Sequence, residues 1–173
     1  MSNLNQLEMF RRDILHEMGH YFDVLETFDC NQQIKSIVFE RCDDVVLSLL
    51  KNIEPSGSDD EAISETYYKV AVISFSIAGR MAADCYIDRD TFVRIKNSHF
   101  LYYSLDEALL NLRPMFGEDG EDEIESTMKT LFKIVQYHME KVSHLEDDEY
   151  QKYMFVAMQG CFYMGAIVEL SLF

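Results

Sequence analysis

Apolar residues recur at steps of three and four along most of the chain, and strict alternation of apolar and polar positions is almost absent. This spacing is typical of amphipathic helices, which bury one face against a core. One such stripe consists of Ile14, Leu15, Met18, Phe22 and Leu25. The pattern therefore predicts an all-α protein.

Three segments without this periodicity, "EPSGSDD", "RPMFGEDGED" and "LEDDEY", divide the chain. Their proline, glycine and acidic residues end one helix and supply N-cap candidates for the next. We expect helices over 4–28, 33–53, 60–86, 104–112, 121–143 and 147–170. The stretch 87–103 fits a loop, a short helix or an edge strand.

Length and composition predict one helical domain over residues 1–173, with enough apolar residues (48%) for a core. The formal charge of −16 would repel a nucleic acid, so we expect protein or peptide partners instead. The four cysteines are widely spaced, and the first residues are polar and mixed in charge, unlike a secretory signal peptide. We therefore expect reduced thiols in a cytoplasmic protein.

The C-terminal segment "YMFVAMQGCFYMGAIVELSLF" is the most apolar part of the chain. Its uncharged run from Tyr153 to Val168 is shorter than the ~20 residues of a membrane span, so a buried helix is expected and not a membrane anchor. Gly160 and Gly165 would let another helix approach closely, including a helix of a second subunit. A homo-oligomer would therefore form through this segment.

The stretch "LHEMGHYFDV" contains His16, Glu17 and His20 in the order H-E-x-x-H. Residues four apart share one face of a helix, so the two imidazoles can bind one ion. Glu17 can reach a water at that ion and act as a general base, as in zinc peptidases. Gly19, in mid-helix, favours close approach of another group. The alternative interpretation is the polar edge of an ordinary helix.

A catalytic zinc site also needs a third protein ligand and one open position. Asp23 and Glu26 occupy the positions where the metzincin motif has glycine and histidine, which excludes that subclass. Asp106, in "YYSLDEALLNL", lies at the start of a predicted helix, where a carboxylate either points into a site or caps the helix. The acidic candidates for the third ligand are Asp106, Glu40, Glu61 and Glu65.

Three segments resemble the FtsH-type zinc peptidases. "HEMGHYF" is similar to their H-E-x-G-H motif, "SIAGRMAADCYI" to their A-G-R-x-A-E-E-like helix, and "SLDEALLNL" to the S-D-x-x-x-A segment that carries an aspartate ligand. The resemblance covers roughly residues 14–112. It implies a mainly helical peptidase domain in which His16, His20 and Asp106 hold zinc and Glu17 is the base.

Other features of the chain qualify this implied function. The chain contains no G-x-x-x-x-G-K-[ST] motif, which an attached ATP-driven unfoldase would have. The expected substrate is therefore an unfolded or flexible protein segment, or one delivered by another protein. In the second segment, the resemblance places Asp84 where the family tends to have an acid. We interpret Gly79 and Arg80 as helix packing and a surface ion pair.

Two further interpretations remain open. "HEMGHY" also resembles the opening motif of the ImmA/IrrE-type peptidases, and "FERCDDVVLSLLKNIEP" resembles the segment that would make Glu40 the third ligand. The other interpretation is a non-catalytic interaction module, including an inactive peptidase homologue that acts as a regulator. Its interface would be the apolar C-terminal helix. We interpret His99, His138 and His144 as surface or core residues and not as ligands.

Overall fold

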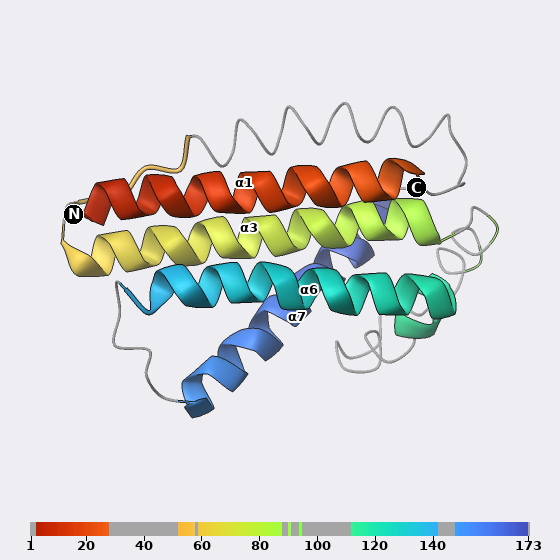
Figure 1. Cartoon of the computed structure of the whole chain (residues 1–173). Coiled ribbons are helices and arrows are strands. Elements are labelled where there is room, and N and C mark those ends of the chain that lie inside the picture. The colour runs from red at the N-terminus through yellow and green to blue at the C-terminus, as the bar shows by residue number, and fades with distance from the viewer. Residues whose placement is uncertain are drawn as a thin grey trace.

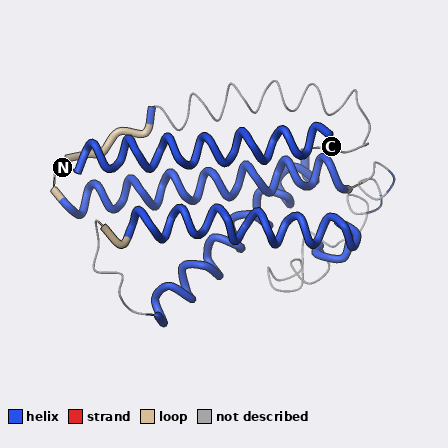
Figure 2. The backbone as a smooth tube through the Cα atoms, in the orientation of Figure 1, coloured by secondary structure: helices blue, strands red, loops and turns tan. Residues whose placement is uncertain are grey.

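The computed structural model describes residues 3–27, 52–57, 59–87, 90, 94, 112–141 and 148–172. Within these ranges there is no strand, which confirms the all-α prediction (Figures 1 and 2). The elements are α1 (Asn3–Thr27), α3 (Asp60–Tyr86), the short 3-10 helix η2 (Arg113–Phe116), α6 (Gly117–Met139) and α7 (Asp148–Leu172). The predicted helices 33–53 and 104–112, and most of the stretch 87–103, lie outside the described residues.

The predicted bounds 60–86 coincide with those of α3 because the local signals are strong. The side chain of Asp59 accepts a hydrogen bond from the backbone N–H of Ala62 at 2.7 Å, as an N-cap does. Asp60 and Glu61 follow in the first turn, where negative charge interacts favourably with the helix dipole.

Helix α6 begins at Gly117, four residues before the predicted start at 121. Pro114 lies in the first turn of η2, and Gly117 adopts a φ of +77° that redirects the chain into α6. The acidic residues Glu118 and Asp119, which looked like part of a loop, form the first turn of this helix. That prediction was wrong because acids at a helix N-terminus resemble a polar loop in the sequence.

Contacts between distant residues fix the directions of the helices. The ring of Phe10 stacks on Tyr67 with centroids 4.7 Å apart, and the hydroxyl of Tyr21 donates to the carbonyl of Ala78 at 3.3 Å. Both pairs are 57 residues apart, so α1 and α3 run parallel in a constant register. Helix α6 is antiparallel to both, because Gly120 near its start lies against Tyr86 at the end of α3, whereas His138 near its end contacts Asp13 in the first half of α1 (Figure 1).

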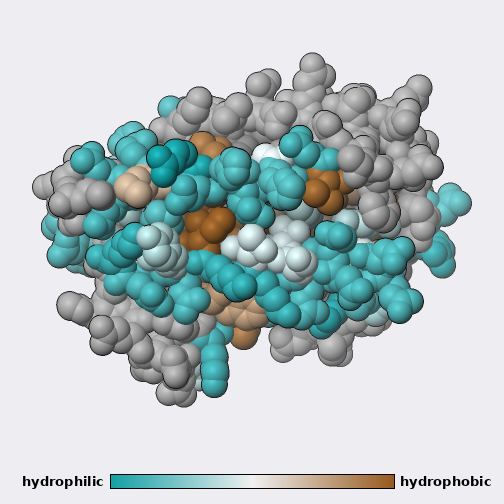
Figure 3. Space-filling model, in the orientation of Figure 1, coloured by the Kyte–Doolittle hydropathy of each residue, from teal (hydrophilic) through white to brown (hydrophobic). Residues whose placement is uncertain are grey.

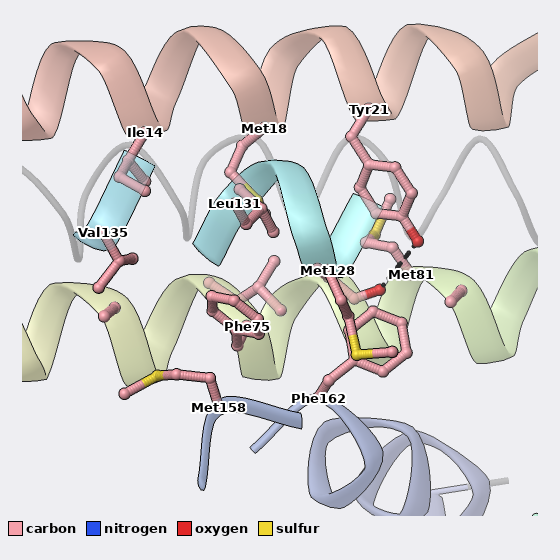
Figure 4. Close-up of a cluster of buried hydrophobic side chains, with 14 of the residues drawn as sticks. Ile14, Met18, Tyr21, Phe75, Met81, Met128, Leu131, Val135, Met158 and Phe162 are labelled. Atoms are coloured by element: carbon pink, nitrogen blue, oxygen red, sulfur yellow. Dashed lines mark hydrogen bonds between the residues drawn. The ribbon is translucent and has the colours of Figure 1, made fainter. Parts of the chain in front are cut away.

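All four long helices contribute to one core. Figure 4 shows side chains of α1, α3, α6 and α7 pointing toward one another, including Met18, Phe75, Leu131 and Phe162, which are all fully buried. Apolar residues at helical spacing thus form one continuous cluster, as the sequence pattern predicts. Among the side chains of α1 that the structure describes, the buried apolar ones are Leu7, Phe10, Ile14, Met18, Tyr21 and Leu25.

The backbones of α3 and α7 touch where the two helices cross. A Cβ added to Gly79 of α3 would overlap the carbonyl oxygen of Phe162, and a Cβ added to Gly165 of α7 would overlap the carbonyl oxygen of Ser76. Each helix therefore presents a glycine to the backbone of the other. Gly165 admits a helix of the same chain, and Gly79 serves helix packing, as its sequence context suggested.

Helix α7 is a packed helix of this bundle. Its inner side, with Met158, Phe162 and Ala166, is buried, and it runs obliquely behind α6 and α3 in Figure 1. No helix in the described part of the chain is long and apolar enough to cross a membrane.

Replacing Gly79 with alanine tests the helix crossing. The new methyl group would displace the backbone of α7, so we expect Gly79→Ala to lower the free energy of unfolding by about 3 kcal/mol or more. Gly19→Ala is the control, because none of the residues that the structure describes has a heavy atom within 4 Å of its Cβ position. That change should instead raise the free energy of unfolding by ~0.5–1 kcal/mol, since alanine favours a helix over glycine.

Denaturant unfolding followed by circular dichroism measures both changes. Equal stability of wild type and Gly79→Ala would contradict the close contact between α3 and α7.

Candidate functional site

The H-E-x-x-H motif lies in the second half of α1, on the side away from the core. His16 and His20 are exposed, and Glu17 is half-buried. At 3.6 residues per turn, the two histidines lie almost opposite the buried Ile14 and Met18. The imidazoles thus share one face, as their spacing predicts, and this face points outward from the bundle.

The register of α1 against α3 decides whether Glu61 or Glu65 can join the histidines. The constant offset of 57 residues places Glu65 level with Glu8 of α1, and Glu61 one turn further from the motif. At 1.5 Å per residue these levels are roughly 12 and 18 Å from His16 along the helix axis. In addition, Glu65 pairs with Lys69 at 2.9 Å. The fold therefore does not bring either glutamate to the motif.

The other two candidate ligands, Asp106 and Glu40, lie outside the described residues. Over the ranges that are described, no three His, Cys, Asp or Glu side chains gather in a way that could hold a metal ion. Gly19 is exposed and has open space at its Cβ position, so nothing in the described part of the chain uses the close approach that this glycine would allow. The described part of the motif therefore consists of two imidazoles on one exposed helix face, with no acid beside them from α3.

His138 is a core residue that contacts a polar side chain. The sequence led us to expect either a surface or a core position for it. It is 2% exposed, and its Nε2 lies 2.7 Å from Oδ2 of Asp13. Its ring also contacts Phe10, with centroids 5.3 Å apart. This pair joins α6 to α1 and satisfies a polar group that would be costly to bury alone. His99 and His144 lie outside the described residues.

An ion pair lies between α3 and α7. The Nε atom of Arg80 is 3.0 Å from Oε2 of Glu169, whose side chain is only 4% exposed. The expected ion pair of Arg80 is therefore present, but its partner is buried and not on the surface. Removing one partner of a buried ion pair lowers the free energy of unfolding by several kcal/mol, because the other charge stays buried.

Asp84 lies one turn after Arg80 on α3 and shares this environment. Burial, and then the nearby carboxylate of Glu169, raise the pKa of Asp84 from 3.8 to about 6. Its Oδ2 atom is buried, and no described residue donates a hydrogen bond to it. The arrangement thus favours a protonated Asp84 at mildly acidic pH, next to a Glu169 that is neutralised by Arg80.

The outer side of α7 is a third candidate, as a binding surface. We define the outer strip of α7 as the apolar positions on its solvent side, which are Tyr153, Val156, Ala157, Gly160, Met164 and Val168. Tyr153 and Val156 are 69% and 64% exposed, which is high for large apolar residues. The helix carries no charged residue from position 153 to position 168. By contrast, the described surface on the face in Figure 3 is mainly hydrophilic.

Comparisons of the chain with protein-family models, with curated proteins and with solved structures found no match in any of the three. The resemblance to FtsH-type and ImmA/IrrE-type peptidases therefore stays a prediction from short motifs. Three groups of residues bear on the function, namely the H-E-x-x-H motif, the cluster of Arg80, Asp84 and Glu169, and the outer strip of α7.

The raised pKa of Asp84 predicts how stability depends on pH. Between pH 4 and pH 6 the unfolded chain ionises at this position while the folded chain keeps its proton, so the free energy of unfolding falls as the pH rises. Asp84→Asn removes this loss. We expect the variant to be more stable than wild type at pH 7, by on the order of 1 kcal/mol after allowing for partial hydration, and equally stable near pH 4.

Thermal or urea unfolding at both pH values measures the difference. The control is Asp122→Asn, which changes an exposed acid of α6 and should not produce a pH-dependent difference. A stability difference for Asp84→Asn that is the same at pH 4 and pH 7 would contradict the raised pKa.

Proposed function

We propose that His16 and His20 bind a zinc ion and that the chain is a zinc-dependent peptidase. The observation that carries the proposal is the exposure of both imidazoles on one side of the continuous helix α1, four residues apart. Two neutral imidazoles in this arrangement are a common half of a zinc site. The three motif segments that resemble FtsH-type peptidases support the same function.

The third ligand in this proposal is Asp106 or Glu40. The helix register argues against Glu61 and Glu65, which leaves the two acids implied by the two family resemblances. Since both histidines face outward, the zinc ion would lie on the outer side of α1, and the third ligand would bind it there.

The zinc ion and Glu17 would have separate roles in the reaction. Zinc, when bound, would polarise the substrate carbonyl and lower the pKa of a water ligand. Glu17, beside His16, would accept the proton of that water and pass it to the leaving amine. The substrate would be an unfolded or flexible protein segment, whose peptide carbonyls are not held in helix or sheet hydrogen bonds and can approach the zinc ion.

A second candidate function is favoured by the outer strip of α7. A non-catalytic interaction protein needs an exposed apolar surface, and exposed apolar patches mark sites of association. In this case the H-E-x-x-H order has no chemical role, which agrees with its position opposite the core. The two functions differ in whether the purified protein holds zinc.

Zinc content of the purified protein, measured by elemental mass spectrometry, tests the proposed function. We expect about one zinc per chain in the wild type and loss of zinc in His16→Ala and His20→Ala, because a site needs both imidazoles. Loss in Asp106→Ala or in Glu40→Ala identifies the third ligand. Glu65→Ala is the matched control and should keep its zinc, because that residue lies two turns away.

A peptidase assay on an unfolded protein then separates binding from catalysis. Glu17→Gln should keep zinc and lose hydrolysis, since an amide cannot act as a general base. A wild type that holds no zinc after reconstitution would rule out the peptidase and leave the interaction protein.

A further inference from the structure

We infer that the outer strip of α7 binds a second copy of this chain, with the two α7 helices antiparallel and crossing at Gly160. The inference is independent of the proposed zinc site, which lies on the outer side of α1. It begins from the different surroundings of the two glycines of α7. The backbone of α3 fills the space beside Gly165, whereas no heavy atom of the described residues lies within 4 Å of the Cβ position of Gly160.

The crossing of α3 and α7 shows how this chain uses such glycines. At Gly79 and Gly165 the missing side chains let two helix backbones come into contact. Gly160 offers the same opening toward solvent, and it costs ~1 kcal/mol of helix propensity compared with alanine. Large apolar side chains flank it, so a helix that packs there would bury apolar surface on both sides of the close contact.

The strip is arranged in a nearly symmetric way around Gly160. Val156 precedes it by four residues and Met164 follows it by four, so the two copies would bring Val156 of each chain against Met164 of the other. Further out, Tyr153 precedes Gly160 by seven residues and Val168 follows it by eight, so these two side chains would meet at levels that differ by only ~1.5 Å along the helix axis. In both pairs a large side chain faces a smaller one. An interface with a twofold axis requires a surface that is complementary to itself in this way.

Charge argues against a basic partner at this strip and permits a second copy there. At −16, two copies repel each other over most of their surface, and a basic partner would bind to the acidic faces. The strip has no charged residue, so it is a surface at which two copies can approach each other without bringing like charges into contact. Added salt screens the remaining repulsion and should therefore strengthen the dimer.

The size of the strip sets the expected affinity. The sixteen residues from Tyr153 to Val168 span ~22 Å of helix, and a helix pair of this length is at the small end of specific interfaces. We therefore expect a dissociation constant in roughly the micromolar range, with monomer and dimer in exchange.

Sedimentation velocity of the full-length chain over a wide concentration range, at low and high salt, tests the inference. The wild type should form a dimer that strengthens with salt. Val156→Glu places a charge in the centre of the strip and should weaken the dimer by at least ~10-fold. Val72→Glu makes the same change at an exposed apolar position of α3 and should leave the dimer unchanged.

Two results would overturn the inference, namely a wild type that stays monomeric at every concentration, or a dimer that Val156→Glu leaves intact. Circular dichroism shows whether each variant is folded. The zinc content is measured on the same samples, so a monomeric protein that holds zinc would refute the dimer alone.

Disulfide trapping tests the antiparallel arrangement in a background whose four native cysteines are replaced by alanine. Gly160→Cys should link to its own copy, because the Cα atoms at the axis lie within disulfide range. Tyr153→Cys should link to Val168→Cys when the two variants are mixed, but not to itself. Self-linking of Tyr153→Cys would show a parallel pair and contradict the inference.

Discussion

The contact between the backbones of α3 and α7 determines the arrangement of the other features. Gly79 and Gly165 each remove a side chain at the crossing, and this brings the two helices close enough for Glu169 to reach Arg80 across the interface. The same contact fixes the rotation of α7 about its axis. Phe162 and Ala166 face the core as a result, and the outer strip faces solvent without a charged residue to keep it hydrated. Burial, and then the carboxylate of Glu169, raise the pKa of Asp84, so packing, electrostatics and the exposed surface have one common origin.

Much of the helical framework could be predicted from the sequence, because it depends on local signals. Helix α3 begins at an aspartate N-cap and carries acids in its first turn, and its predicted bounds are confirmed. The start of α6 was missed because Gly117 and the acids after it are typical of both a loop and a helix N-terminus. The partners of polar core residues are a different case. Arg11, His138 and Glu169 each occupy a position in register with an apolar stripe, which is a detectable sign of a buried polar group. Their partners depend on tertiary packing, and Glu169 lies 89 residues from Arg80.

The candidate metal site shows the same division between local and long-range information. Spacing alone predicts that His16 and His20 share a helix face, and they do. Spacing cannot predict which way that face points, because this depends on the apolar positions of the whole helix and on what packs against them. The register set by Phe10 and Tyr67 then places Glu61 and Glu65 well away from the level of the motif. A short motif therefore identifies a pair of donors, whereas the third ligand follows only from the packing of other segments.

The orientation of α7 can be measured directly by the reactivity of single cysteines. Ala157 and Ala166 lie on the same helix and allow the same small substitution, but Ala157 is exposed and Ala166 is fully buried against α3. In the cysteine-free background, we expect Ala157→Cys in the dilute native protein to react with iodoacetamide as fast as an exposed thiol. Ala166→Cys should react only on unfolding. Equal rates for the two cysteines in the native protein would show that α7 is not fixed against α3, and would contradict the account of this fold.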